Sequence, residues 1–140
     1  MNREYKFRGK PVEDVNFTEI NVHIGKDDFV YGSLIWNDGN PYIVGNVVEA
    51  TDEYISLEQW ISVRPETVGQ YTGLKDKNGV EIYEGDLLAP LKAEVVWNEI
   101  LLCWSFRHQN DTWKTPLFHD TENYMKLEVI GNIHENGDLL

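Results

Sequence analysis

The side chains that could bind a transition metal are few and far apart. A structural zinc site needs four Cys or His ligands at short, paired spacings, and Cys103 is the only cysteine in the chain. The histidines show no such spacing and stand at His23, His108, His119 and His134. We therefore predict no zinc site, and we expect the histidines at the surface or in ordinary hydrogen bonds.

A calcium loop is the next metal site to consider, because Asp76, Asn78 and Gly79 superficially fit its pattern. With Gly79 at the glycine position of an EF-hand, residue 74 would have to be an oxygen ligand and residue 85 a glutamate. These positions hold Leu74 and Gly85 instead. The pattern fails, and we expect no bound metal.

The sequence gives equally little support for a catalytic site. Cys103 lies in an apolar stretch, where a buried thiol behaves as a small hydrophobic group. Glu81, Glu84 and Asp86 are close in sequence and could form an acid–base pair, but carboxylates in a turn are usually solvated. No G-x-S-x-G elbow, Walker motif or Rossmann glycine pattern occurs. We therefore predict a protein that is not an enzyme and holds no cofactor.

The formal net charge is −12, and it is spread unevenly. Residues 1–10 hold four bases and one acid, residues 11–66 two bases and eleven acids, and residues 67–140 six bases and twelve acids, giving +3, −9 and −6. An acidic protein repels phosphate backbones, so we do not expect nucleic-acid binding. The basic residues of the first segment are expected to keep an edge strand soluble, with contact to a phosphate or an acidic partner as the alternative.

Cysteine usage and hydropathy bear on the compartment. One cysteine permits no internal disulfide, and Met1–Arg3 leads into charged residues without an apolar signal segment. The longest apolar run, Ile100–Trp104, is too short to cross a bilayer. We therefore expect a cytoplasmic protein with no membrane partner.

The elements that would position any site are concentrated between residues 68 and 88. Val68–Leu74 is predicted to be a strand, and Asp76–Gly79 a tight turn, because Asn and Gly accept the positive φ of hairpin turns. Val80–Tyr83 resumes a β-prone run before Glu84–Asp86 turns the chain again. The residues of this block shape the backbone or fill a core.

The N-terminal half also predicts β structure. Tyr5–Arg8 alternates large and charged residues, as a half-exposed strand does. Phe29–Trp36 and Pro41–Val44 are predicted to pair around the turn Asn37–Asn40. Ser56–Trp60 is open to two interpretations, a single helical turn or a strand that continues through Val63.

Arg64–Pro65 breaks regular structure, because proline disfavours helix in the residue before it. We place a lobe boundary there, which gives an N-terminal β lobe, residues 1–66, and a C-terminal lobe, residues 67–140. Residues 11–28 indicate a loop followed by a weak strand. The conformation of 11–28 and of the irregular segment 109–125 is left open.

The C-terminal half continues in short strands, predicted at Leu87–Pro90, Ala93–Trp97 and Leu127–Ile133. In Ile100–His108, alternate residues are apolar on both faces, which predicts a central strand covered on both sides. Frequent Gly and Asn turns without a long helical period indicate a mainly β fold, a small barrel or a sandwich, with little helix.

Aromatic side chains could stack on nucleic-acid bases if they were exposed. The candidates are Trp36, Tyr42, Trp97, Trp104 and Trp113. Such a surface also needs a basic groove, and the neighbouring residues are mostly acidic. These aromatics are therefore predicted to lie in the core.

Residues 67–79 (TVGQYTGLKDKNG) and 82–86 (IYEGD) resemble the signature of the YopX family of phage and prophage proteins. Residues 3–8 (REYKFR) are similar to the family's opening and residues 128–136 (EVIGNIHEN) to its closing strand. The structural motif comprises Gly69, Gln70, Tyr71, Thr72, Gly73, Leu74, Asp76, Asn78, Gly79, Ile82, Tyr83, Gly85 and Asp86.

The resemblance implies an SH3-type small β-barrel in the C-terminal part and an origin in phages or integrated elements, which places the protein in the bacterial host cell. It implies no catalytic residue. Our first hypothesis is a non-enzymatic accessory protein that binds a host or phage protein and self-associates into homo-oligomers through β edges and aromatic faces. The alternatives are an acidic DNA mimic that occupies a host nucleic-acid-binding protein, and a small barrel that binds nucleic acid weakly.

Overall fold

The computed structural model describes residues 4–12, 28–90, 92–108, 114–117 and 127–136. Over these residues the chain forms β-strands and one short 3-10 helix, η1 (Pro65–Thr67), which confirms the predicted mainly β class. The chain divides into an N-terminal unit, Glu4–Gln70, and a C-terminal unit that begins at Tyr71. The sequence placed its lobe boundary four residues earlier, after Glu66.

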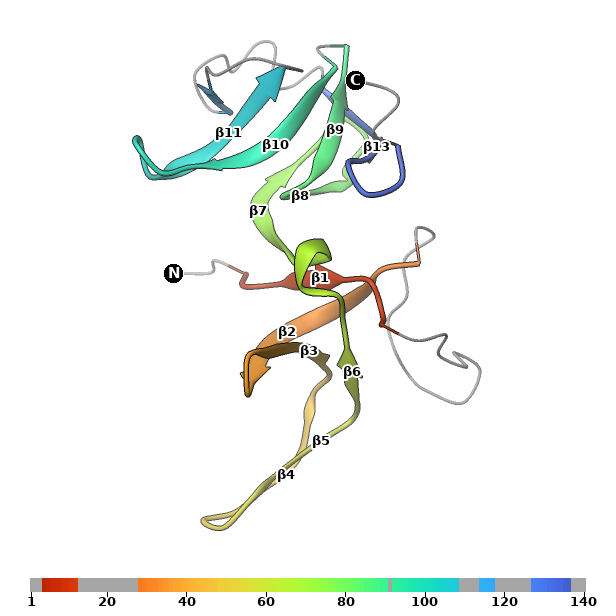
Figure 1. Cartoon of the computed structure of the whole chain (residues 1–140), viewed down its shortest axis with the longest axis vertical. Coiled ribbons are helices and arrows are strands. Elements are labelled where there is room, and N and C mark those ends of the chain that lie inside the picture. The colour runs from red at the N-terminus through yellow and green to blue at the C-terminus, as the bar shows by residue number, and fades with distance from the viewer. Residues whose placement is uncertain (1–3, 13–27, 91, 109–113, 118–126, 137–140) are drawn as a thin grey trace. The chain divides into compact units, whose positions relative to one another are not determined.

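The N-terminal unit is an antiparallel sheet in the order β6-β3-β2-β1, with the first residues of β7 (Gly69–Lys75) paired to β1 (Figure 1). The strands are β1 (Phe7–Gly9), β2 (Val30–Asn37), β3 (Asn40–Val44) and β6 (Trp60–Ser62). The core of this unit gathers Val30, Ile43, Ile61 and Val63. The predicted hairpin between β2 and β3 is confirmed, and its turn residues Asp38 and Gly39 have φ of 50° and 78°.

Beyond Val44 the arms of β3 and β6 continue as a second pair of strands. These are β4 (Val47–Ala50) and β5 (Ile55–Leu57), and they form a separate two-stranded antiparallel sheet. Figure 1 shows this pair extending away from β3 and β6. Of the two interpretations of Ser56–Trp60, the structure has β strands and not a helical turn, but β5 ends at Leu57 and β6 begins at Trp60, so the strand is not continuous.

The C-terminal unit holds a five-stranded antiparallel sheet in the order β12-β11-β10-β9-β13 and the β7–β8 hairpin. Its strands are β7 (Gly69–Lys75), β8 (Glu81–Tyr83), β9 (Asp86–Ala89), β10 (Ala93–Asn98), β11 (Cys103–His108), β12 (Thr115–Pro116) and β13 (Glu128–Asn132). The core gathers Ile82, Leu88, Val95, Leu117 and Leu127. Within the described ranges the sheets are open and no closed barrel forms, so the SH3-type closure is not part of the observed fold.

The predicted central strand Ile100–His108 is wrong in its first three residues. Ile100, Leu101 and Leu102 lie in the loop between β10 and β11, and Ile100 is 91% exposed. The cause is Asn98, whose Oδ1 accepts hydrogen bonds from the amides of Ile100 and Leu101 at 3.0 and 3.1 Å. A side-chain acceptor two and three residues upstream favours a turn over a continuing strand.

The prediction that the aromatic residues lie in the core is wrong for two tryptophans. Trp36 is 56% exposed near the end of the β2–β3 hairpin, and Trp97 is 38% exposed. Trp97 stands opposite Trp104 with ring centroids 5.0 Å apart, so one ring covers the other at the surface. Tyr42 and Trp104 are half-buried. Trp113 lies outside the described residues, as does most of the two segments left open by the sequence.

The Asp76 carboxylate joins the β7–β8 turn to the closing strand. Its Oδ1 accepts hydrogen bonds from the amides of Asn78 and Val80, both at 2.8 Å. Its Oδ2 accepts a third from the amide of Val129 in β13, at 3.0 Å. Asp76 is only 7% exposed, so these three amide donors are the groups that replace water around the carboxylate.

Replacing Asp76 by alanine is expected to lower the free energy of unfolding by about 3 kcal/mol, because three amides lose a charged acceptor. Asp76→Asn should also destabilise, since the amide turns an NH₂ group toward one of the donors. Urea unfolding followed by tryptophan fluorescence measures both, with the exposed Asp52→Ala as the matched control that stays within about 0.5 kcal/mol of the parent. An Asp76→Ala protein as stable as Asp52→Ala would contradict this role.

Candidate interaction surface

The motif residues of β7 and β8 pack and hydrogen-bond to one another. The rings of Tyr71 and Tyr83 stand opposite in the ladder with centroids 5.5 Å apart. Thr72 donates through Oγ1 to the carbonyl of Ile82 at 2.8 Å, and the same oxygen accepts from the amide of Leu74 at 3.1 Å. Gly73 follows with φ of 86°, where the register between the two strands shifts. These residues shape a bulged hairpin.

The second turn of the motif connects three segments. Gly85, with φ of 93°, donates its amide to the carbonyl of Val95, and its own carbonyl accepts from the amide of Ile133. Asp86 is buried, and its Oδ2 accepts from the amide of Tyr83 at 2.7 Å. The expectation of a solvated acidic cluster is thus wrong for Asp86, because a carboxylate that caps a tight turn is drawn under the chain.

The other motif residues also have places in the backbone or core. Gly69 and Gln70 pair with β1 in the N-terminal unit, and Asn78 and Gly79 complete the turn after Asp76. Within the described ranges, no group of three His, Cys, Asp or Glu is arranged to hold a metal ion. The motif residues of β7, β8 and the two turns therefore share a structural block of hydrogen bonds and packed rings.

The candidate chemical groups named from the sequence are dispersed. Cys103 is half-buried rather than enclosed, with Sγ 3.7 Å from Ser105 Oγ. The ring of His108 packs edge-on against Phe106 at 5.9 Å. The amide of His134 donates to Asn132 Oδ1 at 3.0 Å. His23 and His119 lie outside the described residues. The structure brings none of these described side chains together as a nucleophile and base.

The basic cluster at the N-terminus is partly absorbed by the fold. Arg8 is buried, and its guanidinium carbon lies 4.2 Å from the centroid of the Phe29 ring. Lys6 forms an ion pair with Glu4 at 3.2 Å. The expectation of solvent-exposed strand-edge cations is wrong for Arg8, because an arginine can stack flat on an aromatic face.

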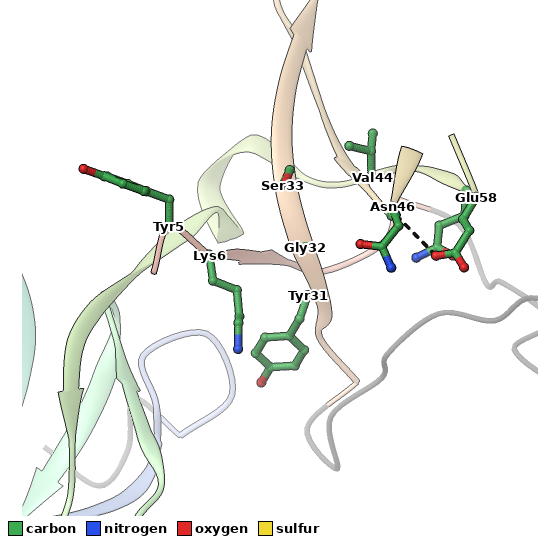
Figure 2. Close-up of a pocket in the computed structure, with 10 residues that line it drawn as sticks. Tyr5, Lys6, Tyr31, Gly32, Ser33, Val44, Asn46 and Glu58 are labelled. Carbon is green, nitrogen blue, oxygen red and sulfur yellow. Dashed lines mark hydrogen bonds between the residues drawn. The ribbon is translucent and has the colours of Figure 1, made fainter. Parts of the chain in front are cut away.

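A pocket of about 570 Å³ lies in the N-terminal unit, where the arms of β3 and β6 leave the sheet. Figure 2 shows Lys6 and Tyr31 on one side of it and Asn46 and Glu58 on the other. Glu58 Oε2 accepts a hydrogen bond from the amide of Asn46 at 3.3 Å. Gln59 also lines the pocket, and its Oε1 is buried with no hydrogen-bond partner among the described residues. The pocket therefore presents polar acceptors at the base of the β4–β5 pair.

The β4–β5 pair, residues 47–57 and hereafter the ribbon, is exposed along its whole first strand. The inner half of the same hairpin buries Ile43 and Ile61, whereas in the outer half Val48 and Ile55 are 66% and 61% exposed. Val47 and Tyr54 are also exposed. Large apolar residues therefore continue along the ribbon past the end of the hydrophobic core, where they are exposed to solvent.

The charge of the ribbon and its base is uniform. Residues 47–60 contain four acids and no base, and all four acids are exposed: Glu49, Asp52, Glu53 and Glu58. A sheet surface that combines apolar groups with one sign of charge is complementary to a basic, partly apolar partner. The sequence shows these acids among the eleven of residues 11–66, but the exposure of residues 47–57 could not be predicted, because their hydrophobic pattern is that of any strand.

The β10–β11 loop is a second apolar surface. Ile100, Leu101 and Leu102, hereafter the tip, are three consecutive exposed aliphatic residues. Asn98 fixes the backbone of the tip from below, and Leu102 has φ of 53°. The tip is therefore an ordered apolar projection.

No described helix has the length and apolar character needed to cross a membrane. No curated protein sequence matches the chain. A family model does match, described as YopX protein, and the match runs over residues 21–140. These residues include the bulged hairpin, both turns of the motif and the strand that Asp76 holds. Because the match covers most of the chain, the protein belongs to the YopX family.

Proposed function

We propose that this protein is a non-enzymatic accessory protein of phage or prophage origin that acts in the host cytoplasm through protein–protein contact. The observation that carries the proposal is the pair of exposed apolar projections, the tip and the ribbon, on hairpins ordered by their own hydrogen bonds. Contiguous exposed apolar groups on a folded domain usually mark binding surfaces. Of the candidate groups named from the sequence, Asp76 and Asp86 hold turns and His108 packs against Phe106.

We also propose that the C-terminal unit is of the SH3-type small-barrel fold type. The strands β7 to β13 are those from which such a barrel would be built. Small barrels commonly use their loops and edges for binding. The tip is one such loop, and we assign to it the self-association of the protein, because Ile100, Leu101 and Leu102 are neutral and would not oppose a second copy.

A second candidate function is mimicry of DNA, since the four exposed acids of residues 47–60 lie on one hairpin. A mimic would occupy the nucleic-acid groove of a host protein. A mimic of DNA needs no aliphatic groups, because the phosphate array that it imitates carries none. A different partner is therefore favoured by the apolar residues that lie among these acids, Val47, Val48, Tyr54 and Ile55. We rank mimicry below contact with a partly apolar protein surface.

Self-association is expected to grow with concentration and to depend on the tip. Light scattering coupled to size-exclusion chromatography should give a mass above that of the monomer at high concentration. The double variant Ile100→Ser, Leu101→Ser should return the mass to the monomer, because it removes apolar area that only a second copy would cover. The control Val47→Ser, Val48→Ser should leave the oligomer intact. A wild-type monomer at every concentration would remove self-association from the proposal.

Nucleic-acid binding is expected to be weak. Fluorescence anisotropy with labelled single-stranded and double-stranded DNA at low salt should show no binding tighter than about micromolar, because an acidic surface repels the phosphates. Nanomolar affinity that weakens steeply with added salt would contradict the prediction and favour the barrel as a nucleic-acid-binding module.

A further inference from the structure

We propose that the ribbon is a docking strip for an extended basic segment of a partner protein, which adds to it as a third β-strand. The inference rests on the proposed role in protein–protein contact and specifies one surface and the chemistry of its occupant. The occupant is a strand in which Lys or Arg alternates with aliphatic or aromatic residues. It is bound by backbone hydrogen bonds along one edge and by opposite charge.

The ribbon has an open sheet edge on either side. β4 and β5 pair only with each other among the described strands. In an antiparallel pair, alternate amide and carbonyl groups of each strand face away from the partner strand. Such an edge is a template for a further strand, and a two-stranded hairpin is the sheet that gains most from a third. Peptide recognition by strand addition uses this geometry.

The ribbon is already shaped before any partner arrives. At its end, Thr51 Oγ1 accepts from the amides of Glu53 and Tyr54, both at 3.2 Å, and the amide of Thr51 donates to the carbonyl of Tyr54 at 2.9 Å. At its base, the amide of Glu58 donates to the carbonyl of Asn46 at 2.8 Å. A pre-ordered edge lowers the entropy cost of binding, which favours recognition of a flexible segment.

Charge decides which occupant fits. A second copy of the ribbon would bring three acids against three, and like charges placed opposite each other across a sheet are destabilising. Anionic membranes and nucleic acids are repelled for the same reason. A basic strand instead meets Glu49 and Glu53 along the ribbon and Glu58 at its base.

The pocket continues the strip at its base. Glu58 contributes a carboxylate there, and Gln59 Oε1 is a buried acceptor with no partner among the described residues. A strand running along the ribbon would end at these two acceptors. A terminal Lys or Arg side chain would donate to Gln59 Oε1 and pair with the Glu58 carboxylate, which already accepts from the amide of Asn46.

The proposal is tested by selecting a displayed library of random peptides of about ten residues on the purified full chain. The recovered peptides should be enriched in Lys and Arg that alternate with Val, Ile, Tyr or Trp, the period of a strand. A synthetic copy of one recovered peptide then serves as the probe in fluorescence anisotropy. N-methylation of alternate amides should weaken its binding about tenfold or more, because it removes the backbone hydrogen bonds of an added strand.

Charge reversal on the ribbon locates the site. Glu49→Lys with Glu53→Lys should weaken the peptide about tenfold or more, since attraction becomes repulsion. The matched control is Glu66→Lys with Glu99→Lys, which makes the same change of net charge at exposed positions off the ribbon and should alter binding less than about threefold. All four positions are exposed, so both variants should keep the parent's circular dichroism spectrum.

Three outcomes would overturn the inference: no enriched peptide, enrichment of acidic or purely apolar peptides, or equal loss of binding in both charge-reversal variants. Self-association through the tip is measured separately by light scattering. A ribbon that binds no basic strand therefore rejects this inference alone, whereas loss of both results would reject protein–protein contact as the function.

Discussion

The hydrogen bonds accepted by the Asp76 carboxylate are the interaction on which the C-terminal unit depends. One oxygen closes the turn between β7 and β8 by accepting from Asn78 and Val80, and the other accepts from Val129 in β13. A buried carboxylate is stable only when donors replace its water, and here every donor is a backbone amide. The Asp76 carboxylate therefore receives all its hydrogen bonds only when the turn and the closing strand, 53 residues away in the sequence, are both folded.

Gly85 connects distant segments in a similar way at the turn between β8 and β9. Its amide reaches β10 and its carbonyl reaches the residue that follows β13, a junction that a φ of 93° makes possible. The family signature and the closing segment are therefore two parts of one hydrogen-bonded block. The signature residues Asp76 and Gly85 are therefore engaged in hydrogen bonds between segments that lie far apart in the sequence.

Local signals predicted the hairpins but not these long-range roles. Asn–Gly and Asp–Gly turns act within four residues, so the β2–β3 and β7–β8 turns could be predicted from their spacing. The contact between Asp76 and Val129 depends on which strands become neighbours, and no local pattern records this. The apolar run Ile100–Leu102 predicts a strand, whereas the competing turn depends on one side chain, Asn98, as the acceptor. The exposure of the ribbon could not be predicted, because the sequence shows which residues are apolar but not whether a hydrophobic core packs against them.

The same division explains where binding can evolve in this fold. The described interior of the C-terminal unit tolerates little substitution, because a change at Asp76 or Gly85 disturbs two segments at once. The tip and the ribbon are each held by hydrogen bonds within their own hairpin, from Asn98 and from Thr51. Their outward side chains can change without disturbing a core, because none lies under them. Apolar groups at such places bring no packing energy to the isolated chain, so their stabilising effect has to come from whatever covers them.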